Sequence, residues 1–209
     1  VRAIVEELKV LYPDSLCSLQ YEKDYELLFA VRLSAQCTDA RVNIVVEDLF
    51  ARYPSVAALA AAEPEDIEAI VKPCGLGHSK ARDISACMRM LRDKYNCQVP
   101  TTFEELLALP GVGRKSANLI MGDVFGKPAI VTDTHCIRLC NKIGLVDGIK
   151  EPQKVEMALW KIVPPEEGSD LCHRFVMHGR AVCNARKPEC EKCCLADICR
   201  YAREEASNV

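Results

Sequence analysis

Residues 109–118 read LPGVGRKSAN and decide the fold, because they join two segments with helical patterning. Two glycines, Gly111 and Gly113, lie two positions apart, which allows positive φ and leaves backbone N–H groups accessible. A helix is predicted to begin directly after them, so its N-terminal N–H groups and its dipole are directed at the same space. Such a turn can bind a phosphate group through the main chain, although an ordinary helical hairpin with a glycine cap would use the same residues.

The residues that follow favour the phosphate-binding interpretation. Arg114 and Lys115 supply positive charge, and the small Ala117 lets two helices pack closely. The segment therefore looks like a helix-hairpin-helix DNA-binding motif. We expect Gly111, Val112, Gly113 and Arg114 to contact DNA.

Helical patterning extends over most of the chain. Apolar spacing predicts a buried helix over 24–36, and Ser79 is expected to cap a longer helix that reaches residue 95. Further helices are predicted near 1–12, 39–53, 55–61, 65–71, 102–109, 114–125, 133–143, 152–162 and 169–180. A brief AIVT segment at 129–132 is the one candidate for extended structure. The fold class is therefore predicted to be all-α.

Composition narrows the class of protein. The chain has 209 residues, of which 49% are hydrophobic and 27% charged, so it can bury a core. With 10 glycines and 11 prolines, it has neither a collagen-like nor a disordered composition. No apolar run is long enough for a membrane span, and the first helix is amphipathic rather than a secretion signal. We expect a cytoplasmic protein, associated with the nucleoid if its partner is DNA.

The charge distribution is uneven. A net charge of −3 counts against a protein that coats nucleic acid non-specifically. Residues 111–142, however, carry five Lys and Arg against two Asp and Glu, and residues 174–200 carry six against three. These two segments are the ones expected to meet an anionic partner.

Two charged residues are candidates for catalysis. Lys115 lies in the predicted first turn of a helix, where it serves either as a phosphate contact or as a nucleophile with an easily lost proton. Asp133 begins the next helix, where it is either a simple N-cap or a carboxylate that stabilises positive charge on a sugar. An antiparallel return of the chain would bring Asp133 to the mouth of the hairpin. A Lys and an Asp facing one cleft are suited to base excision.

The chain has 13 cysteines, and an odd number cannot form a fully paired disulfide framework. Four of them follow the pattern C-x6-C-x2-C-x5-C and can hold one metal centre: Cys183, Cys190, Cys193 and Cys199. Spacing alone leaves zinc and an iron–sulfur cluster as alternatives. Arg186 and Lys187 lie between these ligands and form a basic rim that we expect to contact DNA. Most other cysteines, including Cys194, are interpreted as small apolar side chains outside the ligand set.

Taken together, these segments resemble the endonuclease III family of DNA glycosylases, from Leu33 to Cys199. The resemblance rests on LSAQ-x-TD at 33–39, GL-x-x-SKA at 75–81, LPGVGRKSAN at 109–118, VTDTH at 131–135, HGR at 178–180 and the cysteine pattern. It implies a two-lobed, all-α helix-hairpin-helix glycosylase fold. One lobe would be a six-helix barrel over 17–127, and the other an iron–sulfur domain formed by 1–16 and 128–209. It also implies a [4Fe-4S] cluster on the four cysteines, and a monomer.

The same resemblance implies the activity and its residues. Lys115 would attack C1′ of a flipped, oxidised pyrimidine nucleotide in duplex DNA, and Asp133 would assist this attack and the loss of the base. The Schiff base would permit β-elimination, which cleaves the strand 3′ to the lesion or to an abasic site. Gln36 matches the family residue that fills the gap left by the flipped nucleotide. Leu76 matches the one that wedges the opposite strand.

Two other functions share part of this pattern. An adenine glycosylase acting on A·G-type mismatches would have the hairpin, Asp133 and the cysteines, but it would lack a lysine at position 115 and would carry a recognition domain after Cys199. A non-catalytic DNA-binding module whose C-terminal segment is cross-linked by a metal would have no need of Lys115 and Asp133 together. Substitution of either residue separates these functions.

Overall fold

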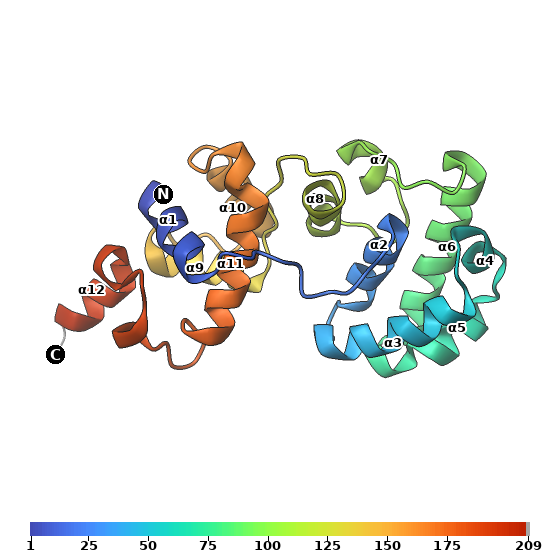
Figure 1. Cartoon of the computed structure of the whole chain (residues 1–209), viewed down its shortest axis with the longest axis horizontal. Coiled ribbons are helices and arrows are strands. Elements are labelled where there is room, and N and C mark those ends of the chain that lie inside the picture. Colours follow the sequence, from blue (N-terminus) through green and yellow to red (C-terminus); the bar gives the residue numbers. More distant parts are fainter. Residues whose placement is uncertain (208–209) are drawn as a thin grey trace. The chain divides into compact units, whose positions relative to one another are not determined.

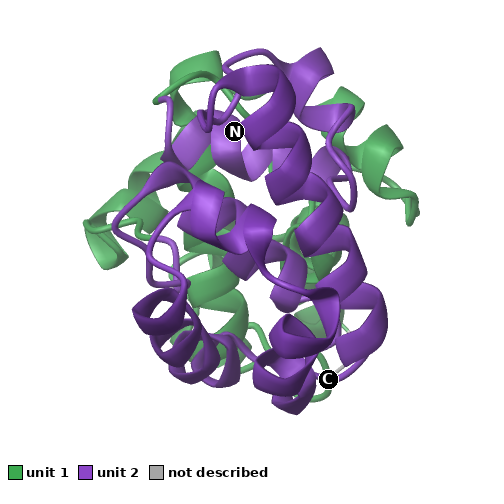
Figure 2. Ribbon diagram, turned by 90° about the vertical axis from the view of Figure 1, so that its right-hand side faces the viewer, with its two compact units in different colours: residues 1–16, 126–209 green, residues 17–125 purple. Residues whose placement is uncertain are grey.

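The computed structural model describes residues 1–207, and every regular element in that range is helical (Figure 1). This confirms the predicted all-α class. The AIVT segment is buried but forms no strand within the described range. The chain divides into two compact units, unit 1 with residues 1–16 and 126–209 and unit 2 with residues 17–125 (Figure 2). None of the helices over 1–207 has the length and apolar character needed to cross a bilayer.

Unit 2 is built around its longest helix, α6, against which α4 and α5 pack. Its elements are α2 (Asp24–Leu33), α3 (Asp39–Arg52), α4 (Val56–Ala61), α5 (Pro64–Val71), the 3-10 turn η1 (Lys72–Cys74), α6 (Gly77–Tyr95), α7 (Phe103–Leu107) and α8 (Arg114–Asp123). Fully buried apolar side chains, such as Leu27, Ile67 and Leu91, come from α2, α5 and α6. Because α8 packs against α2 and α7, the hairpin before α8 is held on this core.

The start of α6 differs from its prediction. Ser79 does not cap the helix, which begins at Gly77 with Leu76 as its N-cap. The backbone of Leu76 is in the left-handed region, with φ 52°. The 3-10 turn η1 and Gly75, with φ 72°, turn the chain so sharply that the helix starts three residues earlier. The prediction was wrong because cap preference describes a side chain, whereas this start is set by the turn before it.

Unit 1 combines the N-terminal helix with the last third of the chain. Its elements are α1 (Arg2–Leu11), α9 (Thr134–Ile143), α10 (Pro152–Leu159), η2 (Pro165–Glu167), α11 (Gly168–Ala181), η3 (Cys190–Lys192), η4 (Ala196–Ile198) and α12 (Arg200–Ser207). Helices α1 and α9 pack against α11, and α12 packs against α9. Leu8 of α1, Leu139 of α9 and Phe175 of α11 are fully buried. Arg174 also donates from Nε to the carbonyl of Tyr12 at 3.1 Å, which ties the end of α1 to α11.

Candidate DNA-binding and catalytic site

The hairpin before α8 is a tight turn with exposed glycines. The Val112 N–H donates to the Leu109 carbonyl at 3.2 Å, and Gly111 has φ 76° after Pro110. Pro followed by a residue with positive φ is the combination that a type II turn requires. Helix α8 follows with Gly113 as its N-cap, and no side chain caps it. The turn therefore offers backbone N–H donors at a helix N-terminus, as phosphate binding requires.

An ion pair lies beneath this turn. Arg32 of α2 donates to Asp83 Oδ2 of α6 from Nη2 at 2.6 Å and from Nε at 2.8 Å. A Cβ added to Gly111 would lie 2.9 Å from the Asp83 Cβ and 3.2 Å from the Arg32 Cδ. Only a glycine allows the turn to approach the pair this closely while keeping positive φ. The sequence pointed to the glycines, but the pair that sets their position joins residues 51 positions apart.

Gly111→Ala is expected to destabilise the protein by about 1–3 kcal/mol, because it adds a Cβ at positive φ and against Asp83. Gly113→Ala is the matched control, since Gly113 has φ −98° and open space around it. Its unfolding free energy should stay within about 0.5 kcal/mol of wild type. Urea unfolding of both variants checks this. Equal unfolding free energies of the two variants would show that the close approach of Gly111 to Asp83 does not contribute to stability.

Lys115 lies in the first turn of α8 and is exposed. Ala117 and Asn118 are buried in the same helix, so Lys115 belongs to its outward face. No hydrogen bond or ion pair within residues 1–207 engages the Lys115 ammonium. Its neighbour Arg114 is half-buried instead, with its guanidinium carbon 4.9 Å from the centre of the Phe103 ring of α7. The two adjacent cations thus differ: the Arg114 side chain packs against Phe103, whereas the Lys115 amine is exposed and can contact a substrate.

Four exposed residues of unit 2 other than glycine have left-handed backbones: Gln36, Leu76, Asn96 and Cys97. Gln36, shortly after α2, has φ 56°, and Leu76, before α6, has φ 52°. Such values are rare for residues with a Cβ and unusual for one as bulky as leucine. Leu76 is 56% exposed, although large apolar side chains are generally buried. Among these four residues, Leu76 combines the left-handed backbone with a large exposed apolar side chain, which is typical of a functional residue rather than of packing.

Asp133 is the N-cap of α9, in unit 1, whereas Lys115 belongs to unit 2. Its Oδ1 accepts a hydrogen bond from the Cys136 N–H at 2.7 Å, so the interpretation as a cap is correct. Helix α9 is held in place by Arg138, which donates to the carbonyls of Gly179 at 3.1 Å and Cys183 at 2.8 Å. Asp133 is half-buried at the end of a fastened helix, and its second carboxylate oxygen has no part in the cap.

The four predicted cysteine ligands lie between α11 and α12, around η3 and η4. Burial, together with the nearby thiols of Cys194, Cys183 and Cys199, raises the pKa of the Cys193 thiol to about 11. Burial and the charges of Cys199 and Cys190 likewise raise the pKa of Cys183, against the lowering effect of the cations Lys142 and Arg138. Each of the four thiols is therefore an electrostatic neighbour of others in the set. Within residues 1–207 no three Cys, His, Asp or Glu side chains are arranged as a site for a single metal ion.

The donor chemistry of this loop nevertheless fits a thiolate-bound group. It holds four thiols within 17 residues, in a segment of short turns rather than long helices. Arg138 and Arg200 anchor the loop at both ends, since Arg200 donates to the carbonyl of Asn141 at 2.9 Å and to Asp147 at 3.0 Å. Cys194, left out of the ligand set by spacing, is half-exposed next to Cys193.

His178 is a neighbour of this loop that sequence reasoning did not find. It is 1% exposed on α11, and its Nε2 lies 3.2 Å from the Cys193 Sγ. Its Nδ1 lies 3.2 Å from the hydroxyl of Tyr12, and burial lowers its pKa. The adjacent Gly179 permits a different close contact, between α11 and α9, because a Cβ there would lie 2.5 Å from the His135 Nδ1. The HGR segment at 178–180 was the available signal, although nothing in it pointed to Cys193.

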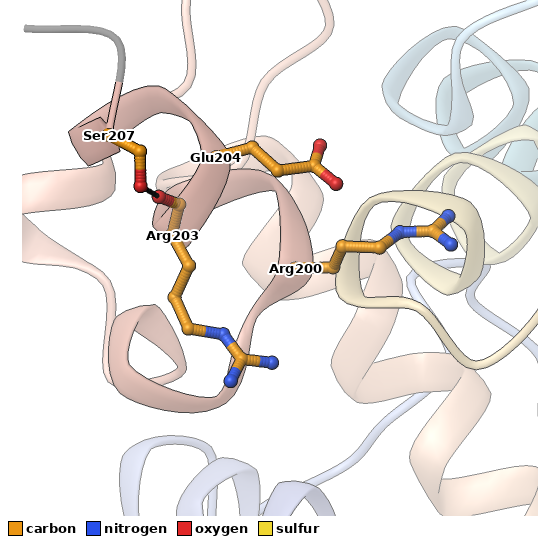
Figure 3. A pocket seen from close by; sticks show the side chains of 4 residues that line it. All are labelled: Arg200, Arg203, Glu204 and Ser207. Carbon is orange, nitrogen blue, oxygen red and sulfur yellow. Dashed lines mark hydrogen bonds between the residues drawn. The ribbon is translucent and has the colours of Figure 1, made fainter.

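The basic residues between the ligands are exposed. Arg186 and Lys187 lie in the loop after Cys183, where the Lys187 N–H donates to the Asn184 Oδ1 at 2.8 Å. This hydrogen bond holds the loop in a turn with both cations on the surface. A pocket on α12 is lined by Arg200, Arg203, Glu204 and Ser207 (Figure 3). The side chains of Arg200 and Arg203 diverge there, so they do not converge on one ligand.

The comparisons with known proteins agree with this geometry. Residues 29–165 match the HhH-GPD superfamily of base excision DNA repair proteins. Endonuclease III of Synechocystis sp. is 43% identical over 197 residues, covering 94% of this chain and 90% of that protein. Endonuclease III of Escherichia coli K12 is 39% identical over 198 residues, covering 95% and 93%. The chain belongs to the endonuclease III family.

The structural comparison gives the same result. A trapped endonuclease III–DNA covalent intermediate matches with a TM-score of 0.92 and 41% identity, covering 98% of this chain and 96% of that one. A non-covalent endonuclease III–DNA complex matches with the same score and identity. The chain is thus an endonuclease III-type DNA glycosylase and AP lyase of base excision repair, and its partner is DNA. The helix-hairpin-helix fold and this function were predicted from the sequence and are confirmed.

Proposed function

We propose that this enzyme removes oxidised pyrimidines from duplex DNA, with Lys115 as the nucleophile. The observation that supports this is the placement of Lys115: exposed, on the first turn of α8, directly after a glycine turn suited to phosphate binding. The lysine therefore sits where a bound backbone would bring a sugar close to a nucleophilic amine.

The proposed base excision and strand cleavage begin at the Lys115 amine. The neutral Lys115 amine attacks C1′ of the flipped nucleotide, and the C1′–N bond breaks with its electron pair leaving on the base. Ring opening then gives a protonated imine between Nζ and C1′. Loss of a C2′ proton to a base expels the 3′ phosphate, and hydrolysis of the imine frees the enzyme. The nucleotide must leave the base stack before this chemistry can begin.

Asp133 is proposed to support the first step. One of its oxygens caps α9, which fixes the orientation of the carboxylate. A negative charge there would stabilise positive charge developing on the sugar and help to take up the Lys115 proton. Its half-buried position at the start of α9 is compatible with this role.

The remaining site residues are proposed to hold the DNA. The hairpin residues Gly111, Val112, Gly113 and Arg114 would bind the backbone, chiefly through main-chain N–H groups. Gln36 would fill the space left by the flipped nucleotide, and Leu76 would enter the opposite strand; their exposure and left-handed backbones support this. Arg186 and Lys187 would add a phosphate contact from unit 1. Since the relatives are bacterial, we place the enzyme on nucleoid DNA in the cytoplasm.

A [4Fe-4S] cluster is proposed on Cys183, Cys190, Cys193 and Cys199. The support is their donor chemistry, their mutual proximity and the family relationship. When bound, such a cluster would cross-link the turns of this loop and thereby hold its basic residues in place. The chain itself contributes Arg138, which ties the loop to α9, and His178, which contacts Cys193.

Cys183→Ser is expected to abolish most iron binding, since a [4Fe-4S] cluster needs four thiolates. Cys194→Ser is the matched control and should keep the full iron and sulfide content, because Cys194 adjoins a ligand without being one. Elemental analysis and visible absorbance of the purified proteins measure this. Stoichiometric zinc in the wild-type protein, or equal iron loss in both variants, would contradict the assignment.

The proposed function is tested by borohydride trapping of the wild-type protein. A duplex with one thymine glycol should yield a covalent protein–DNA adduct, whereas the same duplex with normal thymine should yield none. An A·G mismatch duplex serves as the second comparison. Processing of the mismatch without an adduct would overturn the proposal in favour of an adenine glycosylase. Binding of all duplexes without turnover would overturn it in favour of a binding module.

A further inference from the structure

One lysine of α6 is completely buried. Lys80 has 0% of its surface exposed, in the first turn of the helix. Its Nζ donates to three backbone carbonyls: Leu33 at 2.8 Å, Ala35 at 2.7 Å and Cys74 at 2.8 Å. An ammonium group has three N–H donors and no acceptor, so these three bonds satisfy it.

The three carbonyls belong to two different segments of unit 2. Leu33 ends α2 and Ala35 immediately precedes Gln36, whereas Cys74 ends η1, two residues before Leu76. The last carbonyls of a helix have no partner within the helix, and a cation is favourable there. One ammonium group thus caps the ends of two elements, each of which leads into an exposed residue with a left-handed backbone.

Other contacts join the same two segments. Burial raises the pKa of the Cys74 thiol to about 11 and the nearby Cys37 thiol contributes to this rise, and Cys37 directly follows Gln36. The Lys80 N–H donates to the carbonyl of Leu76 at 3.0 Å, so the backbone of Lys80 also holds that residue. The side chain of Lys80 therefore reaches both segments, and its main chain also holds the second one.

Burial lowers the pKa of Lys80, because the charged ammonium loses its hydration in the protein interior. A buried ammonium is retained only when its hydrogen bonds are made in full. A methionine or leucine would fill the same space without this cost, but it would leave three carbonyls unpaired. The residue is thus poorly explained by packing and well explained by the backbone geometry that it imposes.

We infer that Lys80 is a positioning residue, which fixes Gln36 and Leu76 relative to each other so that both enter the duplex together when a nucleotide is flipped. This inference rests on the proposed roles of those two residues. A left-handed backbone at a non-glycine residue persists only when its surroundings hold it there. Lys80 supplies that restraint at both positions at once. Without Lys80, the backbones of Gln36 and Leu76 can relax independently. The two side chains are then no longer positioned together to offset the energy of unstacking the flipped base.

Lys80→Met is the direct test, because it keeps the volume and removes the three donors. The fluorescence of 2-aminopurine next to thymine glycol reports flipping, and single-turnover excision reports the outcome. We expect flipping and excision to slow about tenfold or more. AP lyase activity on a single-stranded abasic site, which requires no flipping, should change less than about threefold.

Leu91→Ala is the matched control, since Leu91 is equally buried on α6 and contacts neither segment through a polar atom. It should lower the melting temperature while leaving flipping close to wild type at a temperature where both proteins are folded. If Leu91→Ala slows flipping as much as Lys80→Met, the role of Lys80 is general stability and the inference is wrong.

A double-mutant cycle separates this inference from the proposed function. Gln36→Ala and Leu76→Ala alone test the proposed function, because both should impair flipping. In a protein with both alanines, Lys80→Met should cause little further loss, since Lys80 acts through those side chains. Full additivity would overturn the inference while leaving the proposed function intact. If Lys80→Met does not fold, Lys80→Arg takes its place in the cycle under the same criterion.

Discussion

Lys115→Gln protein is expected to form no borohydride adduct with a thymine glycol duplex and to lose about a thousandfold or more in excision rate. Glutamine keeps the length and polarity of the side chain but has no amine to attack C1′. Because no hydrogen bond or ion pair within the described residues engages the Lys115 side chain, its loss should leave the fold unchanged. Trapping and single-turnover assays measure the chemistry, and a binding assay in the same buffer measures affinity.

The adjacent Arg114 provides the control for this variant. Arg114→Gln removes the neighbouring positive charge and the contact with Phe103. It should weaken DNA binding, with a smaller dependence on salt concentration, while still forming the adduct once DNA is saturating. If Lys115→Gln also only weakened binding and trapping persisted, the nucleophile would have to be another amine.

Asp133→Asn is expected to slow base excision by about a hundredfold or more, with unfolding free energy within about 0.5 kcal/mol of wild type. The stability is preserved because asparagine is as good an N-cap as aspartate, and its amide oxygen can accept the bond from the Cys136 N–H. Only the negative charge is lost. Single-turnover excision and chemical unfolding, measured on the same preparation, separate the charge from the cap.

Asp133→Ala is the companion variant, because it removes both the charge and the cap. It should lose about 1 kcal/mol of stability in addition to the same loss of activity. Asparagine and alanine variants that differ in stability but share one excision rate would assign the catalytic effect to the charge. An asparagine variant with wild-type activity would show that the carboxylate is a helix cap only.

Several features of this protein were predictable from the sequence because they are local. Helices follow from apolar spacing, and the hairpin follows from two glycines at fixed distance, since backbone conformation there depends on neighbouring residues. The Asp133 cap was foreseen for the same reason. The four cysteines were identified from spacing alone, but spacing did not choose between zinc and iron.

One local prediction was wrong, because the turn before a helix outweighs the cap preference of a single side chain. Ser79 has the preference of a cap, yet α6 starts at Gly77, because η1 and Gly75 direct the chain into the helix earlier. The left-handed backbone of Leu76 also contradicts the preference of leucine. It is maintained by its surroundings, including the hydrogen bond between its carbonyl and Lys80.

The sequence by itself therefore determined the class of fold, the hairpin and the candidate nucleophile, whose properties arise within a few consecutive residues. The contacts that hold the hairpin and the other site residues in place are visible only in the tertiary structure. The Arg32–Asp83 pair beneath Gly111 and the contact of His178 with Cys193 join residues far apart in the chain. The burial of Lys80 among three carbonyls depends in the same way on where two helices end in space. Hydrogen bonds to backbone carbonyls depend on the direction of the chain rather than on side-chain identity, so no sequence pattern reveals them.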